Sequence, residues 1–479
     1  MKTTSKLALL AAAGLMFGGA AATSAEEAKK KPDPAFDLFA DQNTPFTFAG
    51  ITIYGTVDVG YSSLTHGSSP SDVATVTQPF VVQKWSNGST SSLVQSPLEQ
   101  SKLGIKGTEK IVDDWSLVFK AETGFDPLSF KLVDGLKSLT NDNGPAQPGL
   151  NAIPPGYIQQ ADSSRAGQIF QGAGWGGISN KTLGTLTYGR QNAILFDALQ
   201  AADPMNAAGA FGLIGYSGTV GGGAGDTEDA RLDNSIRYAN TIGDASKTGA
   251  VRVGAEYQFA QVQEGGVGYQ LGLGFDYKGF SLDGVYVNKA SGIAASTDTK
   301  AYSVGTNLVG VTISDNTAYA VTARYDGGIF KLFAGYENIS QANPSNTMSL
   351  AGGDQIIGGY VVDGNLITTS KYTASKVAQM EWLGAKVNID PKFAVTGAYY
   401  HLSQNDYTNS AVCSGANGNL SSGSCAGTED VYSILLDYQA TKRWDVYGGA
   451  MYSKVNDGLA SGFTNTDNTA VTVGSRFKF

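Results

Sequence analysis

Few residues of this chain could carry out covalent chemistry. It holds two histidines, His66 and His401, and two cysteines, Cys413 and Cys425. A hydrolase or transferase needs a nucleophile with a base positioned beside it. Neither histidine lies in a recognisable catalytic motif, and the cysteines do not form a CxxC pair. The sequence therefore predicts no enzyme, no cofactor and no metal site.

Charged side chains are the second group that could act on a solute. Acidic residues gather in the Ala- and Gly-rich stretch 192–230, namely Asp197, Asp203, Asp226, Glu228 and Asp229. Basic residues occupy the polar parity of the flanking segments, namely Lys102, Lys106, Lys120, Arg231, Arg237, Arg252 and Arg324. Because side chains alternate across a strand, this parity directs the cations toward water.

Short amphipathic strands must position these residues. The last strand, 471–479, has Val and Phe on one parity and Arg476 and Lys478 on the other. Similar alternation recurs and gives about sixteen strands, each long enough to cross a membrane when tilted. Short turns such as 278–279 alternate with long polar loops such as 125–165, as in outer-membrane barrels. We therefore predict an all-β fold, a transmembrane antiparallel β-barrel with short periplasmic turns and long extracellular loops.

Two positions need a local choice. Arg190 shares its parity with Leu186 and Tyr188, which should face lipid, so it reaches the water side only if a β-bulge follows Gly189. We predict that bulge and place Arg190 on the pore wall. Residues 300–315 could form an extra strand. Since an odd strand count would separate the two termini, we place them in a loop, 290–316.

The ends of the chain indicate export. Residues 1–25 have a basic start and an apolar, Ala- and Gly-rich middle, which predicts a secretory signal peptide. Residues 26–46 lack strand alternation and predict a periplasmic N-terminal tail. The barrel should then occupy residues 47–479.

Charge and cysteine content add two expectations. The chain has 33 basic and 42 acidic residues, and no basic stripe that could follow phosphates, so we expect no nucleic-acid partner. An exported chain can keep a disulfide. Because both cysteines fall in one expected outer loop, we predict a Cys413–Cys425 bond.

A set of segments is similar to a known family in chain order: 53–58, 101–109, 183–191, 231–238, 330–336 and 441–449. As an ordered set they resemble the general porins of Gram-negative outer membranes, a sixteen-stranded trimeric family. The resemblance implies passive diffusion of small hydrophilic solutes and ions through a homotrimer in outer-membrane lipid. It also implies that the third loop, about 192–230, folds into the pore. Phe479 would then be the assembly signal that the barrel-assembly machinery reads.

The implied pore has an electrostatic consequence. If acids of this loop faced Lys102, Lys106 and Lys120, a transverse field would orient dipolar solutes and penalise apolar ones. The sign of ion selectivity stays open, because the acidic total favours cations and the basic wall favours anions.

Other readings remain. The channel could be selective for one substrate class, or the chain could be a secreted soluble β-rich surface or adhesin protein. Only the soluble protein would be extracted without detergent.

Overall fold

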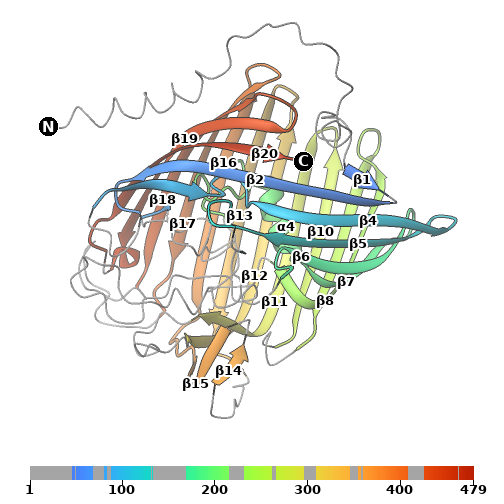
Figure 1. Ribbon diagram of the computed structural model, residues 1–479. Coiled ribbons are helices and arrows are strands. Elements are labelled where there is room, and N and C mark those ends of the chain that lie inside the picture. The colour runs from blue at the N-terminus through green and yellow to red at the C-terminus, as the bar shows by residue number, and fades with distance from the viewer. Residues whose placement is uncertain are drawn as a thin grey trace, which may run out of the picture. The chain divides into compact units, whose positions relative to one another are not determined.

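A closed β-barrel forms the body of the protein (Figure 1). The computed structural model describes residues 46–48, 50–67, 80–82, 88–130, 132, 169–214, 231–260, 266–295, 309–345, 354–357, 360–407, 425–461 and 463–479. Within these ranges, sixteen antiparallel strands close the barrel, which confirms the predicted fold class. The predicted signal peptide and tail lie outside the described residues, except Phe46.

The barrel strands are β2 (Ile51–Leu64), β4 (Lys102–Val112), β5 (Trp115–Gly124), β6 (Ala173–Asn180), β7 (Gly184–Asn192), β8 (Arg231–Asp244), β9 (Gly249–Gln258), β10 (Gly268–Tyr277), β11 (Phe280–Ala295), β12 (Val309–Asp326), β13 (Phe330–Ala342), β16 (Lys376–Asn388), β17 (Phe393–Gln404), β18 (Gly427–Gln439), β19 (Trp444–Asp457) and β20 (Asp467–Lys478). The remaining elements are β1 (Phe46–Phe48), β3 (Thr90–Gln95), β14 (Asp354–Ile357), β15 (Tyr360–Thr369), α4 (Ile194–Ala202) and the 3₁₀ helix η4 (Gly458–Ala460). None of the described helices is long and apolar enough to cross a membrane.

Strand β2 closes the ring. One edge pairs with β20, for example Val57 with Phe477. The other edge pairs with β4 along 51–56 and with β3 along 59–64. The connection 96–101 leaves the ladder between these two strands. Closure pairs the backbone groups that a lipid environment could not satisfy.

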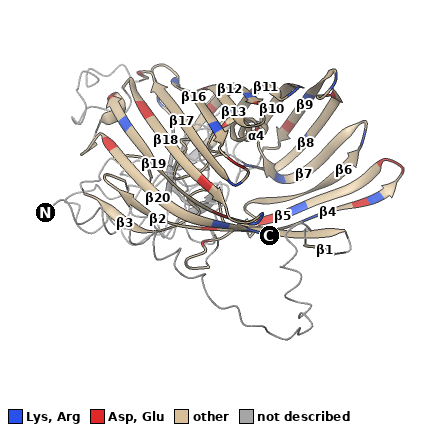
Figure 2. Ribbon diagram, turned by 90° about the horizontal axis from the view of Figure 1, so that it is seen from above, with Lys and Arg blue, Asp and Glu red and all other residues tan. Residues whose placement is uncertain are grey.

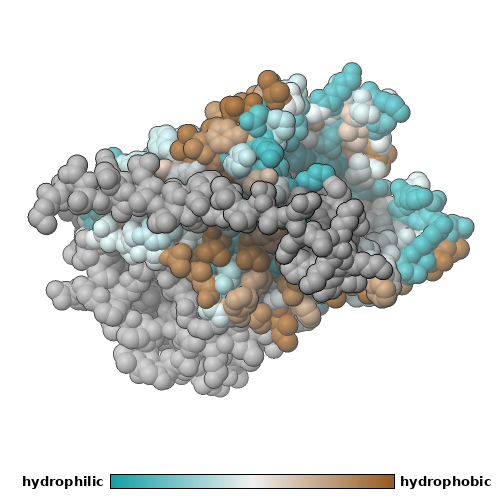
Figure 3. Space-filling model, turned by 45° about the horizontal axis from the view of Figure 1, so that its top comes forward, coloured by the Kyte–Doolittle hydropathy of each residue, from teal (hydrophilic) through white to brown (hydrophobic). Residues whose placement is uncertain are grey.

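The wall has an apolar outer face. On β10, Leu271 and Leu273 are exposed outward, whereas Gln270 is buried on the inner face. Aromatic pairs border this band toward both ends, for example Tyr269 with Tyr286 and Tyr325 with Phe330. In Figure 3, apolar side chains form broad brown patches on this surface, and teal polar side chains occupy the projecting tips. Such a band with aromatic borders is typical of a barrel in lipid.

The structure corrects one boundary and adds elements. β11 runs to Ala295 and β12 begins at Val309, so the prediction of a loop over 290–316 is wrong at 290–295 and at 309–316. The two strands stay paired beyond the barrel wall, which alternation alone does not distinguish from a loop. β3 and the β14–β15 hairpin are additional elements in the connections β2–β4 and β13–β16.

Candidate pore constriction

The predicted constriction loop enters the barrel directly after β7. Its described part is 193–214, and it begins with α4, which contacts the inner faces of β9–β13. Figure 2 shows α4 within the ring of strands. The Ile194 side chain rests where Gly272 has no side chain, because a Cβ there would lie 2.8 Å from Ile194 Cγ2. The Leu195 amide also donates to Gln270 Oε1 at 2.9 Å.

The C-terminal end of α4 is tied to the wall by polar contacts. Trp382 Nε1 donates to the Ala202 carbonyl at 2.9 Å, and Tyr400 donates its hydroxyl proton to Asp203. Asp203 also accepts from the Ala207 amide at 2.6 Å and is only 2% exposed. Burial raises the pKa of Asp203 to about 6, although its hydrogen bonds act in the opposite direction. Asp203 is therefore an anchor of the loop rather than a charge that faces the solute.

Beyond this anchor, residues 205–214 form an apolar wedge inside the barrel. Its buried members are Met205, Ala207, Ala208, Ala210, Phe211, Leu213 and Ile214. Except for Ala207, they share a core with inward side chains of β2, β3 and β16–β20, including Leu64, Val94, Met380, Leu402, Val431, Leu435, Tyr447, Met451 and Ala470. Phe211 packs edge-on against Tyr447, with ring centres 6.1 Å apart. The wedge fills this side of the lumen.

The other side of the lumen stays polar. A cavity of about 510 Å³ lies beside α4, against β6–β11. Arg237 Nη2 lies 2.7 Å from Asp197 Oδ2 in its lining. Arg252 bridges neighbouring strands, with nitrogen–oxygen distances of 2.6 Å to both Asp276 and Asp283. These pairs give the cavity fixed charges of both signs.

The lysines of the predicted basic wall are on the inner face. Lys120 Nζ lies 3.1 Å from Glu122 Oε2, and Tyr54 donates to the same oxygen at 2.8 Å. Lys106 Nζ lies 5.3 Å from the centre of the Tyr54 ring. The carboxylate beside these cations thus comes from the wall itself.

The acids of the loop do not meet these lysines as we expected. Asp197 pairs with Arg237 and Asp203 with Tyr400, because α4 docks on β9–β13, away from β4 and β5. The prediction that acids of this loop face Lys102, Lys106 and Lys120 is therefore wrong for Asp197 and Asp203. Asp226, Glu228 and Asp229 lie outside the described residues.

Arg190 lies on the inner side of the wall, as the predicted bulge after Gly189 requires. The β7–β8 register shifts between Gly189 and Gln191, so the predicted bulge is present. Gly189 has a φ of +122°, a region that favours glycine. Arg190 is 6% exposed, and its Nη1 lies 2.6 Å from Asp233 Oδ1. Arg231 is buried on β8, and Arg324 Nη1 lies 3.4 Å from the Ala201 carbonyl oxygen.

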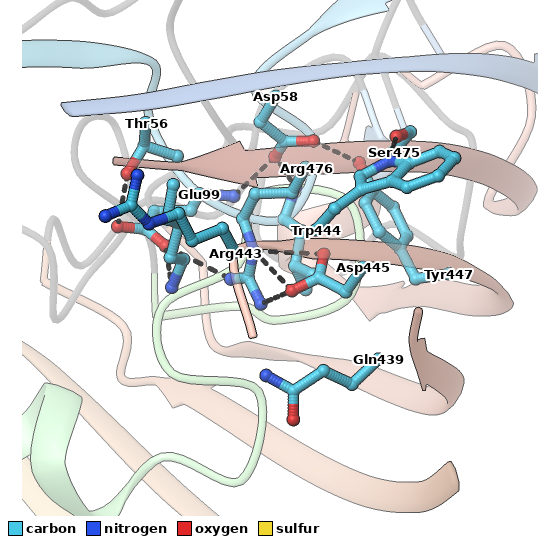
Figure 4. A network of polar contacts seen from close by, with 12 residues as sticks. Thr56, Asp58, Glu99, Gln439, Arg443, Trp444, Asp445, Tyr447, Ser475 and Arg476 are labelled. Carbon is cyan, nitrogen blue, oxygen red and sulfur yellow. Dashed lines mark hydrogen bonds and ion pairs between the residues drawn. The ribbon is translucent and has the colours of Figure 1, made fainter. Parts of the chain in front are cut away.

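A polar network connects the last strand, β20, to the segment 96–101 (Figure 4). Glu99 lies 3.1 Å from both Arg476 and Lys102 and 2.7 Å from Lys478. Burial alone would raise the pKa of Glu99, but these cations hold it at about 2. Arg476 Nη2 also lies 2.6 Å from Asp445. Opposite charges thus hold Glu99 against the β20 side of the barrel.

Sequence reasoning missed three of these partners. Glu122 shares the inward parity of Lys120, so alternation contained a signal that could have found it. Asp445 likewise stands on the inward parity of β19. Glu99 lies in a connection without alternation, and nothing local in the sequence marks it.

The C-terminal residue and the cysteines complete the predicted sites. Phe479 exchanges backbone hydrogen bonds with Gly55, at 3.0 and 3.1 Å. Cys425 is buried and disulfide-bonded. Cys413 lies outside the described residues, so the Cys413–Cys425 pairing stays a prediction.

The chain resembles known bacterial outer-membrane proteins in both sequence profile and structure. A profile of the Gram-negative porins matches residues 7–458, whereas no curated protein matches the chain. The anion-selective porin from Comamonas acidovorans is similar in structure, with 15% identity, a TM-score of 0.55, and coverage of 90% of this chain and 99% of that one. OmpT of Vibrio cholerae gives 13% identity and 0.53, covering 91% and 100%. The outer-membrane channel DcaP of Acinetobacter baumannii gives 14% and 0.50, covering 90% and 99%. These likenesses support the barrel fold, and the profile match over nearly the whole sequence means that the chain belongs to the Gram-negative porin family.

Proposed function

We propose that small hydrophilic solutes and ions pass this barrel along its polar side, between α4 and the strands β4–β11. The protein is an outer-membrane channel for passive diffusion. Its family and fold indicate a channel rather than an enzyme. The observation that carries the proposed route is the charged cavity beside α4, because the apolar wedge occupies the opposite side.

Cysteine labelling tests this route. Thr241 lines the cavity, and Leu271 is exposed on the outer face of β10. Purified Thr241→Cys protein in a planar bilayer should lose current when a charged, water-soluble thiol reagent is added. The matched Leu271→Cys protein should not respond. A Thr241→Cys channel that ignores the reagent would place the route elsewhere, and a pure protein without any current would contradict the channel itself.

We also propose that the channel prefers anions. Lys106 and Lys120 lie opposite each other in register, and Glu122 supplies one carboxylate beside them. The anion-selective porin from Comamonas acidovorans has a similar fold. A reversal potential measured in a low-salt KCl gradient, where screening is weakest, should show preference for chloride. A potential of the opposite sign would refute this preference.

Location and assembly complete the proposal. The family indicates the outer membrane. We propose that residues 1–25 direct export, that the barrel-assembly machinery recognises the C-terminal strand, and that the channel is a homotrimer. A trimer form of OmpT of Vibrio cholerae is among the similar structures. Unboiled protein should migrate as a trimer on a denaturing gel and shift on heating, and N-terminal sequencing should start at Glu26. A monomer that salt alone extracts would refute the assembly.

A further inference from the structure

Two lysines and two aromatic residues share one patch of the inner wall. In the strand register, Lys106 of β4 faces Lys120 of β5, and Lys120 faces Trp175 of β6. Side chains in register point to the same face of a sheet, so these residues line the lumen together. Tyr54 of β2 lies over Gly104, where a Cβ would come within 2.3 Å of the tyrosine ring. Its ring thereby reaches the lysines.

The patch carries a net positive charge. Lys106 Nζ and Lys120 Nζ lie 5.3 and 5.9 Å from the centre of the Tyr54 ring. Glu122 accepts from Tyr54 and lies 3.1 Å from Lys120, so one carboxylate stands beside two ammonium groups. Like charges directly opposite each other destabilise a strand pair. An anion bound between the lysines would relieve this repulsion.

Two glycines flank Trp175 on the inner wall. Trp175 is half-buried on the lumen side of β6. Its partner in register on β7 is Gly189, and the next inward position on β6 is Gly177, so neither position has a side chain that covers the indole. These two neighbouring positions therefore leave the indole uncovered along β6 and β7. Offset or edge-on contact between aromatic rings is favourable beyond the area it buries.

We propose that this patch is a subsite for small aromatic carboxylates, with the carboxylate between Lys106 and Lys120 and the ring against Trp175. The subsite rests on the proposed function, since a solute reaches it only through the lumen. It assigns this channel a preferred class of anion rather than only a sign of charge.

Two anions of matched charge and similar size separate ring recognition from charge. Benzoate and cyclohexanecarboxylate are both ionised at neutral pH, and only benzoate is aromatic. The measurement is the concentration of each anion that halves the chloride current of the pure channel. The wild-type value for benzoate should be lower by roughly two- to twelvefold, the range expected for one aromatic contact.

Variants assign the effect to residues. Trp175→Leu should abolish the benzoate preference and keep the chloride current. The double variant Lys106→Gln/Lys120→Gln should weaken block by both anions. A matched control is Lys331→Gln/Lys386→Gln, because these lysines also face each other in register, across β13 and β16. It removes the same charge and should preserve the preference. The heat shift on a gel verifies that each variant is folded.

The outcomes separate the subsite from the channel. Equal half-blocking concentrations in the wild type, or a preference that survives Trp175→Leu, would overturn the subsite and leave the channel intact. A folded protein that conducts no KCl would overturn the proposed route and the subsite together.

Discussion

Phe211→Ala is the most direct test of how the constriction loop is held. The Phe211 side chain is fully buried in the apolar wedge and packs against Tyr447 and the backbone of Gly449. Truncating a buried Phe to Ala costs about 3–5 kcal/mol, since both transfer energy and contacts are lost. Each 1.4 kcal/mol changes an equilibrium about tenfold. The loss of about 3–5 kcal/mol should therefore lower the ratio of docked to released loop by at least about a hundredfold. The barrel itself should stay folded, because its strand ladder does not depend on this ring.

Hydrogen exchange measures this ratio at a defined amide. The Ala210 amide donates to the Pro97 carbonyl at 2.9 Å, a bond that exists only while the wedge is docked. In Phe211→Ala, a peptide covering 203–214 should lose about a hundredfold of protection, and peptides from β9–β11 should be unchanged. The control is Phe130→Ala, because Phe130 is 81% exposed. Unchanged protection of 203–214 would mean that contacts other than the apolar core hold the loop, and would refute the reasoning.

Further predictions concern pH, the bulge and the chain end. Asp203 has a pKa of about 6 in the docked loop and 3.8 as its ordinary value, so docking should be strongest below pH 3.8 and weaken as pH rises through 6. Hydrogen exchange of 203–214 between pH 4 and 8, corrected for intrinsic rates, should show this slope, and Asp203→Asn should flatten it. Gly189→Ala should lower the temperature of the heat shift, because its φ is +122° and a Cβ would lie 2.3 Å from the Gly174 carbonyl. Gly284→Ala is the control, since a Cβ there meets nothing within 4 Å; an equal drop in both variants would contradict the strain. Deleting Phe479 removes its hydrogen bonds with Gly55 and should lower the folded fraction in outer-membrane preparations, whereas normal yield would argue against an assembly role.

The wall was predictable from the sequence because its signal is local. Alternation of side chains decides which residues face lipid, and it gave the strand number and the inward cations. It even located the bulge, since Arg190 could not otherwise leave the lipid face.

The partners inside the lumen were not predictable in the same way. Which groups meet there depends on strand register and on where the loop docks, both of which are set by contacts between residues far apart in sequence. Asp197 and Asp203 could thus be identified as loop acids, but not as partners of Arg237 and Tyr400. Glu99 lies in a connection without any periodic pattern.

The apolar wedge makes the open cross-section of this channel independent of the circumference of its barrel. The number of hydrogen-bonded strands sets the circumference, whereas residues 205–214 set how much of the cross-section stays open. Substitutions in the wedge can therefore widen or narrow the passage without breaking a single bond of the strand ladder. Replacing this one segment would therefore adapt the same barrel to solutes of different size, which makes the barrel a suitable scaffold for engineered nanopores.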